Sequence, residues 1–315
     1  MKILVTGAAG FIGSHLCEEL LKDKDNTVKG VDDMIGPTPF WLKVKNIETL
    51  LEEKRFTFVK ENLLTADLSH LLADIDAVYH LAAIPGVRTS WGDQFHPYVH
   101  HNILALQRLL EACKQQPLKA FIFASTSSVY GEKLGKVSED AELHPLSPYG
   151  VTKLTGEKLC RVYQKSFNLP VITLRFFTVY GPRQRPDMAF HRFIIQHLDQ
   201  KPLTIYGDGR QIRDFTFIED CVKGTAAVLQ RQNLIGETLN IGGTARASLL
   251  EVISLLEEIS GTKIRLTFSD RVSGEPSQTW ADISKAKQAL NYAPAISLKD
   301  GLAKEFAYLQ SVYAR

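Results

Sequence analysis

The chain has almost no net charge and no long apolar run, and each absence excludes a class of function. Its 37 Lys and Arg residues nearly balance 35 Asp and Glu residues, which leaves a formal charge of +2. That balance offers no bulk attraction to nucleic acid. No stretch approaches the roughly 18 consecutive apolar residues that a membrane span needs. The apolar run at residues 1–5 is too short for a signal peptide, and Gly7 and Gly10 interrupt it. We therefore expect a cytoplasmic protein with neither a nucleic-acid nor a membrane partner.

Cysteine is also scarce, and its spacing argues against a metal centre. The four cysteines lie far apart in the chain, and no pair has Cys-x-x-Cys or metal-ligand spacing: Cys17, Cys113, Cys160 and Cys221. We expect reduced thiols and no metal site. The remaining composition, 44% apolar and 23% charged over 315 residues, is that of a soluble enzyme with a large core and two lobes.

A glycine-rich turn near the N-terminus predicts a phosphate-binding site. The apolar residues 2–6 read as a strand, Gly7, Gly10 and Gly13 follow, and a periodic helix begins at their end. Such a turn points free backbone N–H groups and a helix dipole at an anion. The spacing is G-x-x-G-x-x-G rather than the commoner G-x-G-x-x-G, and a tight strand–helix turn also needs glycine.

A second strand at residues 27–31 places a carboxylate at the same edge. It ends at Asp32 and Asp33, and Asp32 stands 19 residues after Gly13. That position suits an acceptor for a ribose diol. The carboxylate also repels a 2′-phosphate, which favours NAD over NADP. A loop acid after a strand is the alternative.

The alternation of strands and helices predicts an α/β fold, a Rossmann-type doubly wound parallel sheet with a smaller α/β C-terminal substrate domain. Further strands are expected at residues 55–60, 75–80, 119–124, 170–176, 203–209 and 237–241. Helices are expected, after an exposed one within 36–54, at residues 98–115, 148–167, 189–199, 219–230, 247–260, 283–290 and 299–312. We assign 1–176 plus 214–241 to the NAD-binding domain, and 177–213 plus 242–315 to the nucleotide-sugar domain. The residues that follow strands meet at one edge of such a sheet, where ligands bind: Gly7, Asp32, Asn62, Ala82, Ser127 and Thr178.

Two later stretches carry candidate chemistry. Tyr149 and Lys153 are four residues apart, so they share one helix face, and a lysine beside a tyrosine lowers the phenol pKa. A phenolate of this kind is a general base for an alcohol, although a chance pair on a solvated helix has the same spacing. Five arginines within 31 residues favour a phosphorylated substrate: Arg183, Arg185, Arg192, Arg210 and Arg213.

With these residues in view, the chain resembles the extended short-chain dehydrogenase/reductases of the NAD-dependent epimerase/dehydratase family over essentially its whole length. The resemblance rests on the glycine turn, Asp32 and the motifs at residues 80–83, 125–131, 149–153, 174–183 and 206–215. It implies a tightly bound NAD that is recycled in each turnover. It also implies the following cofactor contacts: Gly7, Gly10, Phe11, Ile12, Gly13, Asp32, Asp33, Asn62, Leu63, Leu81, Ala82, Ala83, Asn102, Tyr149 and Lys153.

Within the family the chain is most similar to bacterial UDP-glucuronic acid 4-epimerases, through residues 84–91 and 126–131. The resemblance implies an isomerase that makes UDP-galacturonic acid through a 4-keto sugar. Tyr149 is then the base, Lys153 lowers its pKa and binds the nicotinamide ribose, and Thr126, Ser127 and Ser128 hold the sugar. The implied substrate contacts are Gly86, Val87, Arg88, Thr126, Ser127, Ser128, Thr178, Arg185, Phe190, Arg192, Ile205, Tyr206, Gln211, Arg213 and Arg271.

Two departures bear on the substrate. Related decarboxylases carry a glutamate where this chain has Ser128, which argues for epimerisation without loss of CO2. Many relatives carry an asparagine where this chain has Thr178. The alternatives are a UDP-glucose or UDP-N-acetylglucosamine 4-epimerase, a UDP-glucuronate decarboxylase, a dehydratase, or a redox-sensing binding protein. Relatives also form homodimers through two helices that correspond to 98–115 and 148–167, and we expect a homodimer here.

Overall fold

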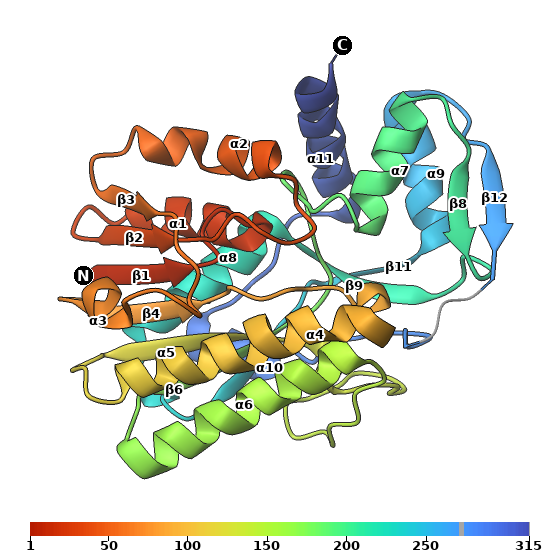
Figure 1. Ribbon diagram of the computed structural model, residues 1–315. Helices are drawn as coiled ribbons and strands as arrows, with labels where there is room; N and C mark the ends of the chain where they lie inside the picture. Colours follow the sequence, from red (N-terminus) through yellow and green to blue (C-terminus); the bar gives the residue numbers. More distant parts are fainter. Residues whose placement is uncertain (271–273, 315) are drawn as a thin grey trace.

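A seven-stranded parallel sheet forms the centre of the molecule (Figure 1). The computed structural model describes residues 1–270 and 274–314. The strand order is β10-β6-β5-β4-β1-β2-β3. Successive strands are added outward from β1 on one side and outward from β4 on the other, which confirms the predicted doubly wound sheet. In chain order the strands are β1 (Lys2–Thr6), β2 (Thr27–Val31), β3 (Phe56–Val59), β4 (Ala77–His80), β5 (Ala120–Thr126), β6 (Val171–Phe176) and β10 (Thr238–Ile241).

Helices cover both faces of this sheet because its strands are apolar on both sides. Along β5, Phe121 and Phe123 pack against the helices of one face, and Ile122 packs against those of the other. The first face carries α3 (Leu68–Leu72), α5 (Ala105–Cys113) and α6 (Pro148–Phe167). The second carries α1 (Phe11–Leu21), α2 (Phe40–Leu51), α8 (Ile218–Ala227) and α10 (Ser284–Leu290).

Two small sheets and three helices form a second lobe beyond the carboxyl ends of the main strands (Figure 1). One sheet has the order β11-β9-β7, and the other pairs β12 with β8. The strands are β7 (Val179–Tyr180), β8 (Leu203–Tyr206), β9 (Ile212–Phe217), β11 (Ala245–Ser248) and β12 (Leu266–Ser269). The helices are α7 (Ala189–Leu198), α9 (Leu249–Ser260) and α11 (Leu298–Tyr313). Sequence reasoning missed β7, β9, β11 and β12 because short strands of mixed polarity have no clear period.

The helix predicted over 98–115 begins earlier and is not uniform. It starts with α4 (Phe95–Tyr98), continues as a π-helix over Val99–Leu104 and ends as α5. Short 3₁₀ turns occur at Arg88–Ser90, Gly92–Gln94, Ser127–Val129, Val228–Gln230 and Gln232–Leu234. The helix predicted as exposed within 36–54 is α2, and it buries Leu42, Lys43, Ile47 and Leu50.

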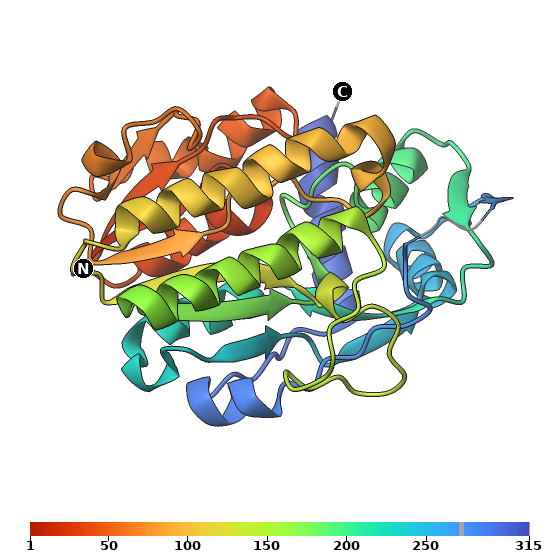
Figure 2. The ribbon, with the colours of Figure 1, turned by 60° about the horizontal axis from the view of Figure 1, so that its bottom comes forward.

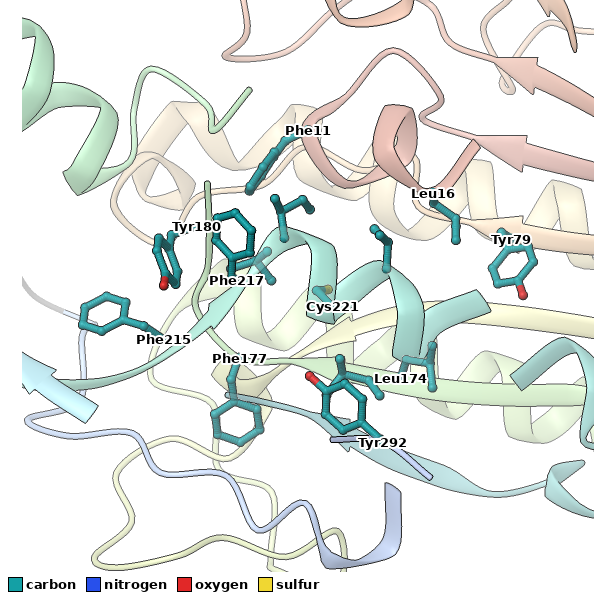
Figure 3. Packing of buried hydrophobic residues seen from close by; sticks show 14 of the residues in the cluster. Phe11, Leu16, Tyr79, Leu174, Phe177, Tyr180, Phe215, Phe217, Cys221 and Tyr292 are labelled. Atoms are coloured by element: carbon teal, nitrogen blue, oxygen red, sulfur yellow. The ribbon is translucent and has the colours of Figure 1, made fainter. Parts of the chain in front are cut away.

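One apolar cluster joins the two lobes (Figure 3). Phe11 and Leu16 of α1 and Leu174 of β6 belong to it, together with Phe215 and Phe217 of the small sheet. The cluster therefore connects the helix after the glycine turn to the strands of the second lobe. The predicted domain boundaries stay a prediction, although β10 joins the main sheet and β9 joins the small one.

Two further features bear on the sequence-based expectations. All four cysteines are free and buried. Among the helices of residues 1–270 and 274–314, none combines the length and apolarity needed to cross a bilayer.

Candidate active site

A cavity of about 1170 Å³, counted to its open mouth, runs along the carboxyl ends of the main strands. It spans the point between β1 and β4 at which the strand order reverses. Fourteen of the fifteen predicted cofactor contacts line it: Gly7, Gly10, Phe11, Ile12, Gly13, Asp32, Asp33, Asn62, Leu63, Leu81, Ala82, Ala83, Tyr149 and Lys153. Arg185, predicted as a substrate contact, lines it as well.

The glycine turn delivers the N-terminus of α1 to this cavity. The N-cap residue is Gly10, and no side chain of the described residues caps it, so backbone N–H groups of the first turn stay available to an anion. A Cβ at Gly13 would lie 2.1 Å from the Gly7 carbonyl oxygen. The turn can therefore close only with glycine at that position.

Asp32 follows β2 and is held rigidly at the cavity wall. Its carboxylate accepts hydrogen bonds from the Ala9 N–H at 3.1 Å and the Met34 N–H at 2.7 Å. The Lys43 ammonium of α2 lies 2.7 Å from it, and both side chains are less than a tenth exposed. Lys43 lines the cavity too, and sequence reasoning missed it because the ten residues between it and Asp32 carry no motif.

Asp33, Asn62 and His101 form the next part of the wall. The Asn62 amide donates to Asp33 at 2.8 Å. His101 comes from the π-helical segment and was not predicted, although its position on the inner face of the 98–115 helix was a usable signal. Asn102 does not line the cavity. Its amide is satisfied by the backbone of Ile84 and by the Thr152 hydroxyl, so it holds the loop after β4 in place.

Tyr149 stands in the first turn of α6. Ser147 caps this helix by accepting from the Gly150 N–H at 3.1 Å, and Pro148 occupies its first position. Burial raises the pKa of Tyr149, while the Arg185 guanidinium and a hydrogen bond with Thr126 lower it. The lowering of the Tyr149 pKa by Lys153, which the sequence suggested, stays a prediction, and Arg185 is a second cation that sequence reasoning did not assign to this role. Asp187 accepts two hydrogen bonds from Arg185, each 3.0 Å long, and so fixes its orientation.

Lys153 is buried one turn further along α6. Its ammonium lies 4.4 Å from the centre of the Phe123 ring. Burial lowers the pKa of Lys153 to about 8, and the neighbouring Cys160 and Glu157 oppose that shift. The residue is therefore a cation at neutral pH that loses its proton more readily than a solvated lysine.

A turn of hydroxyl side chains faces Tyr149 at the end of β5. The Thr126 hydroxyl accepts from the Ser128 N–H at 3.2 Å and donates to the Ser128 hydroxyl at 3.3 Å. A Cβ at Gly150 would lie 2.8 Å from the Ser128 carbonyl oxygen, so glycine there lets the turn pack on α6. Ser127 is the first residue of the 3₁₀ turn Ser127–Val129, which directly follows β5.

A second pocket lies in the smaller lobe, and two of the five clustered arginines, Arg210 and Arg213, line it. Its lining includes three predicted contacts, Tyr206, Gln211 and Arg213, together with Glu275. The guanidinium groups of Arg88 and Arg192 lie 4.5 Å and 5.3 Å from the centre of the Tyr206 ring. The Glu275 carboxylate lies 2.6 Å from Arg88 and 3.5 Å from Arg213. Glu275 was not predicted, because an isolated acid in a polar stretch carries no local signal.

Other predicted substrate contacts occupy different places. Phe190 is 1% exposed and packs with Tyr180 and Phe215, and Ile205 is fully buried. Neither side chain is exposed enough to stack on the uracil base of a UDP-sugar. Gly86 and Val87 belong to the loop after β4, and Thr178 follows β6 with its carbonyl bound to the Thr216 N–H. Arg271 lies outside the described residues.

The fold and the cavity define a class of protein: a Rossmann-type dinucleotide-binding fold with a half-buried Tyr149 and a buried Lys153 one turn apart on α6, built like the short-chain dehydrogenase/reductases. Residues 3–242 match the model of the NAD dependent epimerase/dehydratase family. The chain belongs to that family.

Three relatives narrow the comparison. YtcB of Bacillus subtilis (strain 168), named as an uncharacterised UDP-glucose epimerase, is 72% identical over 99% of each chain. The UDP-glucuronate 4-epimerase of Thermodesulfobacterium geofontis is 39% identical over 95% of this chain and 93% of its own. The crystal structure of UDP-glucuronic acid 4-epimerase from Bacillus cereus, in complex with UDP-glucuronic acid and NAD, matches with a TM-score of 0.99. Its sequence is 62% identical, and the match covers 99% of this chain and 100% of that one.

Proposed function

We propose that this enzyme converts UDP-glucuronic acid to UDP-galacturonic acid by inverting C4, with NAD as its cofactor and without loss of CO2. The observation that carries the proposal is the hydroxyl turn of Thr126, Ser127 and Ser128 beside Tyr149, which contains no acid. The likeness to the Bacillus cereus enzyme, whose structure contains UDP-glucuronic acid and NAD, supports it.

The large cavity fits NAD. The uncapped N-terminus of α1 suits a diphosphate, and Asp32 suits a ribose diol. Tyr149 and Lys153 lie in the same cavity as these groups. When bound, NAD supplies the hydride acceptor and donor that inversion at C4 requires. Lys43 offsets part of the Asp32 charge, yet the carboxylate still disfavours the extra phosphate of NADP.

Tyr149 handles the proton on sugar O4. Its phenolate takes this proton as C4 is oxidised and returns it after the 4-keto sugar has turned over in the site. Arg185 and the Thr126 hydroxyl favour the phenolate against the effect of burial. Lys153 adds a buried cation to the same end of α6 and is placed to hold the nicotinamide ribose.

The hydroxyl turn serves the substrate carboxylate. A 4-keto-glucuronate is a β-keto acid and loses CO2 when its C–C bond aligns with the ketone. Hydrogen bonds from hydroxyls to a carboxylate contribute about 1.5–3 kcal/mol each, which is enough to hold one orientation. Thr126, Ser127, Ser128 and Thr178 are the groups that we assign to this task.

The second pocket takes the UDP end. Arginine forks match phosphate oxygens, and Arg88, Arg192 and Arg213 meet around Tyr206. Tyr206 is the ring available to a base, and Gln211, which donates to the Tyr206 carbonyl at 3.0 Å, holds the strand end. Arg271 stays a predicted contact.

UDP-glucose is the second candidate substrate, because the name of the 72% identical relative contains it. The purified protein is to be incubated separately with UDP-glucuronic acid, UDP-glucose and UDP-N-acetylglucosamine, and the products followed by NMR. We expect inversion at C4 of UDP-glucuronic acid and no pentose. Tyr149→Phe should lower kcat by about 10²–10⁴-fold, since it removes the base. Preferential conversion of UDP-glucose, or a fully active Tyr149→Phe variant, would reject the proposal.

We further propose a homodimer formed through α5 and α6 in the cytoplasm. The two helices lie side by side on one outer face (Figures 1 and 2). Leu104, Val151, Val162 and Phe167 on or beside them are 45%, 47%, 56% and 47% exposed, although much of each helix packs within the chain. Four free thiols suit a reducing compartment.

Light scattering after gel filtration tests the dimer. Val162→Glu should halve the measured mass, because it places a charge in an apolar interface. Leu134→Glu is the matched control, since Leu134 is 85% exposed in the loop before α6. An equal mass for wild type and Val162→Glu would contradict the α5/α6 interface.

A further inference from the structure

A buried ion pair that the proposed reaction leaves unused lies beneath the catalytic end of α6. Glu157 follows Lys153 by one helical turn and faces β5 and β6. The Arg175 guanidinium of β6 donates two hydrogen bonds, 3.0 Å and 2.8 Å long, to the Glu157 carboxylate. The Arg175 and Glu157 side chains are only 5% and 9% exposed. Because a buried charge is costly unless it is paired, the position of this pair so close to Lys153 needs a reason.

Glu157 also reaches the cavity. The Ser125 hydroxyl donates to it at 2.5 Å, and Ser125 lines the cavity beside Lys153. On its other side Arg175 donates to the Tyr130 hydroxyl at 2.8 Å and to the Glu139 carbonyl at 3.0 Å. The Tyr130 hydroxyl in turn donates to Asn240 of β10 at 2.7 Å. The pair thus connects the end of β5, the start of α6 and the edge strand of the main sheet.

Few other charges act on Lys153. His80 of β4 is neutral, since burial lowers its pKa to about 3, and burial raises the pKa of the Cys160 thiol of α6 well above neutrality. Burial raises the pKa of Tyr130 to about 12 and that of Cys113 on α5 to about 12. Tyr98 of α4 and Arg185 face Tyr149 rather than Lys153. Among the described residues, Glu157 is the charged group that favours the Lys153 ammonium.

We propose that Glu157 is a positioning residue for the reaction, because its carboxylate sustains the charge of Lys153 and fixes Ser125 at the cavity wall, while Arg175 keeps that carboxylate buried. This inference rests on the proposed function. It deepens that function by assigning the electrostatic support of the Tyr149/Lys153 pair to a residue that does not touch the substrate.

A charge-based role makes a directional prediction. Removing the carboxylate leaves Arg175 as an unpaired cation, which disfavours a second cation at Lys153 and favours a phenolate at Tyr149. Both limbs of the kcat profile then move to lower pH in Glu157→Gln. We expect the limb that reports Lys153, whose pKa burial lowers to about 8 in the wild type, to move down by about one pH unit or more. In Glu157→Gln/Arg175→Met both charges are gone, so this limb should lie between those of Glu157→Gln and wild type.

Two further variants separate charge from geometry. Ser125→Ala keeps the ion pair and loses only the hydrogen bond, so it should lower kcat without moving the pH limbs. Glu237→Gln, which breaks an exposed 2.7 Å pair with Lys285, is the matched control and should leave the profile as in wild type.

Two measurements decide the matter. The pH profile is taken with whichever of the three UDP-sugars the wild type converts. Independently of activity, the titration midpoint of Lys153 is followed by NMR on protein labelled at lysine. A wild type that converts none of the sugars rejects the proposed function alone, because the NMR titration still tests Glu157. An unchanged Lys153 midpoint in Glu157→Gln overturns this inference, as does a double variant whose limb lies below that of the single one.

Discussion

At the scale of single residues, we propose that the identity of residue 128 determines whether the site retains a labile substrate carboxylate. Ser128 is tied to Thr126 by two hydrogen bonds, and its carbonyl packs on Gly150, next to Tyr149. A serine there offers a donor to a substrate carboxylate and adds no charge. A glutamate side chain would be longer and would bring a second negative charge within a few ångströms of the substrate carboxylate.

Ser128→Glu should therefore release the carboxylate from its hydroxyl contacts. Two like charges at about 4 Å repel by about 4 kcal/mol at a partly screened site, so kcat/KM for epimerisation should fall by about tenfold or more. CO2 release and UDP-pentose should appear, measured by NMR of the products. Ser128→Ala is the control, because it shortens the side chain without adding charge. If Ser128→Glu gives wild-type turnover and no CO2, position 128 has no part in retaining the carboxylate.

At the scale of an element, the C-terminal helix α11 holds the loop that carries Thr178 and Arg185. Glu305 of α11 is fully buried and accepts from the Gly181 N–H at 2.8 Å. Its other oxygen has no hydrogen-bond partner among the described residues. Burial raises the pKa of Glu305 well above that of a solvated glutamate, so the folded state favours the neutral acid.

This shift makes stability depend on pH in a defined direction. The folded protein binds a proton at Glu305 more tightly than the unfolded chain, so stability falls as pH rises above about 4.5, the ordinary pKa of glutamate. Glu305→Gln keeps the acceptor for Gly181 without a charge. In thermal unfolding from pH 5 to 8 it should lose less stability than wild type as pH rises. Glu305→Leu leaves the buried Gly181 N–H without an acceptor and should cost about 1–3 kcal/mol near pH 5, and less at higher pH, where wild type itself loses stability. A Gln variant with the wild-type pH slope would contradict this account.

At the scale of the whole molecule, the second pocket joins segments that are distant in sequence. Arg88 follows β4, Arg213 lies in β9, and Glu275 belongs to the polar stretch before α10. The Glu275 carboxylate bonds the same guanidinium groups that we assign to the diphosphate. We propose that phosphate oxygens displace this carboxylate from the two guanidinium groups, and that the exchange weakens binding.

Glu275→Gln should thus tighten UDP binding. Partly exposed ion pairs contribute about 0.2–1 kcal/mol, which corresponds to a Kd about 1.4- to fivefold lower by titration calorimetry. Asp208→Asn removes one negative charge from the lining of the same pocket and is the control, because the Asp208 carboxylate bonds the Arg210 N–H instead. An affinity for UDP in Glu275→Gln that equals or falls below that of wild type would contradict the proposed competition. An equal gain in Asp208→Asn would show that the tighter binding comes from the net charge of the pocket and not from release of the arginines.

Local features of the sequence determined much of this protein. The strand, glycine turn and helix at residues 2–21, the carboxylate at Asp32 and the helix that carries Tyr149 and Lys153 were all predicted. They follow from apolar period, turn chemistry and helix capping, which act over a few residues. The doubly wound sheet follows from their alternation, and fourteen predicted cofactor contacts line one cavity as a result.

Tertiary structure alone decided which distant side chains meet. It paired Lys43 with Asp32, brought the charge of Arg185 to Tyr149, and set Glu275 among the arginines. It also buried the side chains of Phe190 and Ile205 in the core. Apolar period shows that a side chain is buried but not what it is buried against. Contacts between separate elements depend on how those elements and the two lobes pack, and no local pattern encodes that packing.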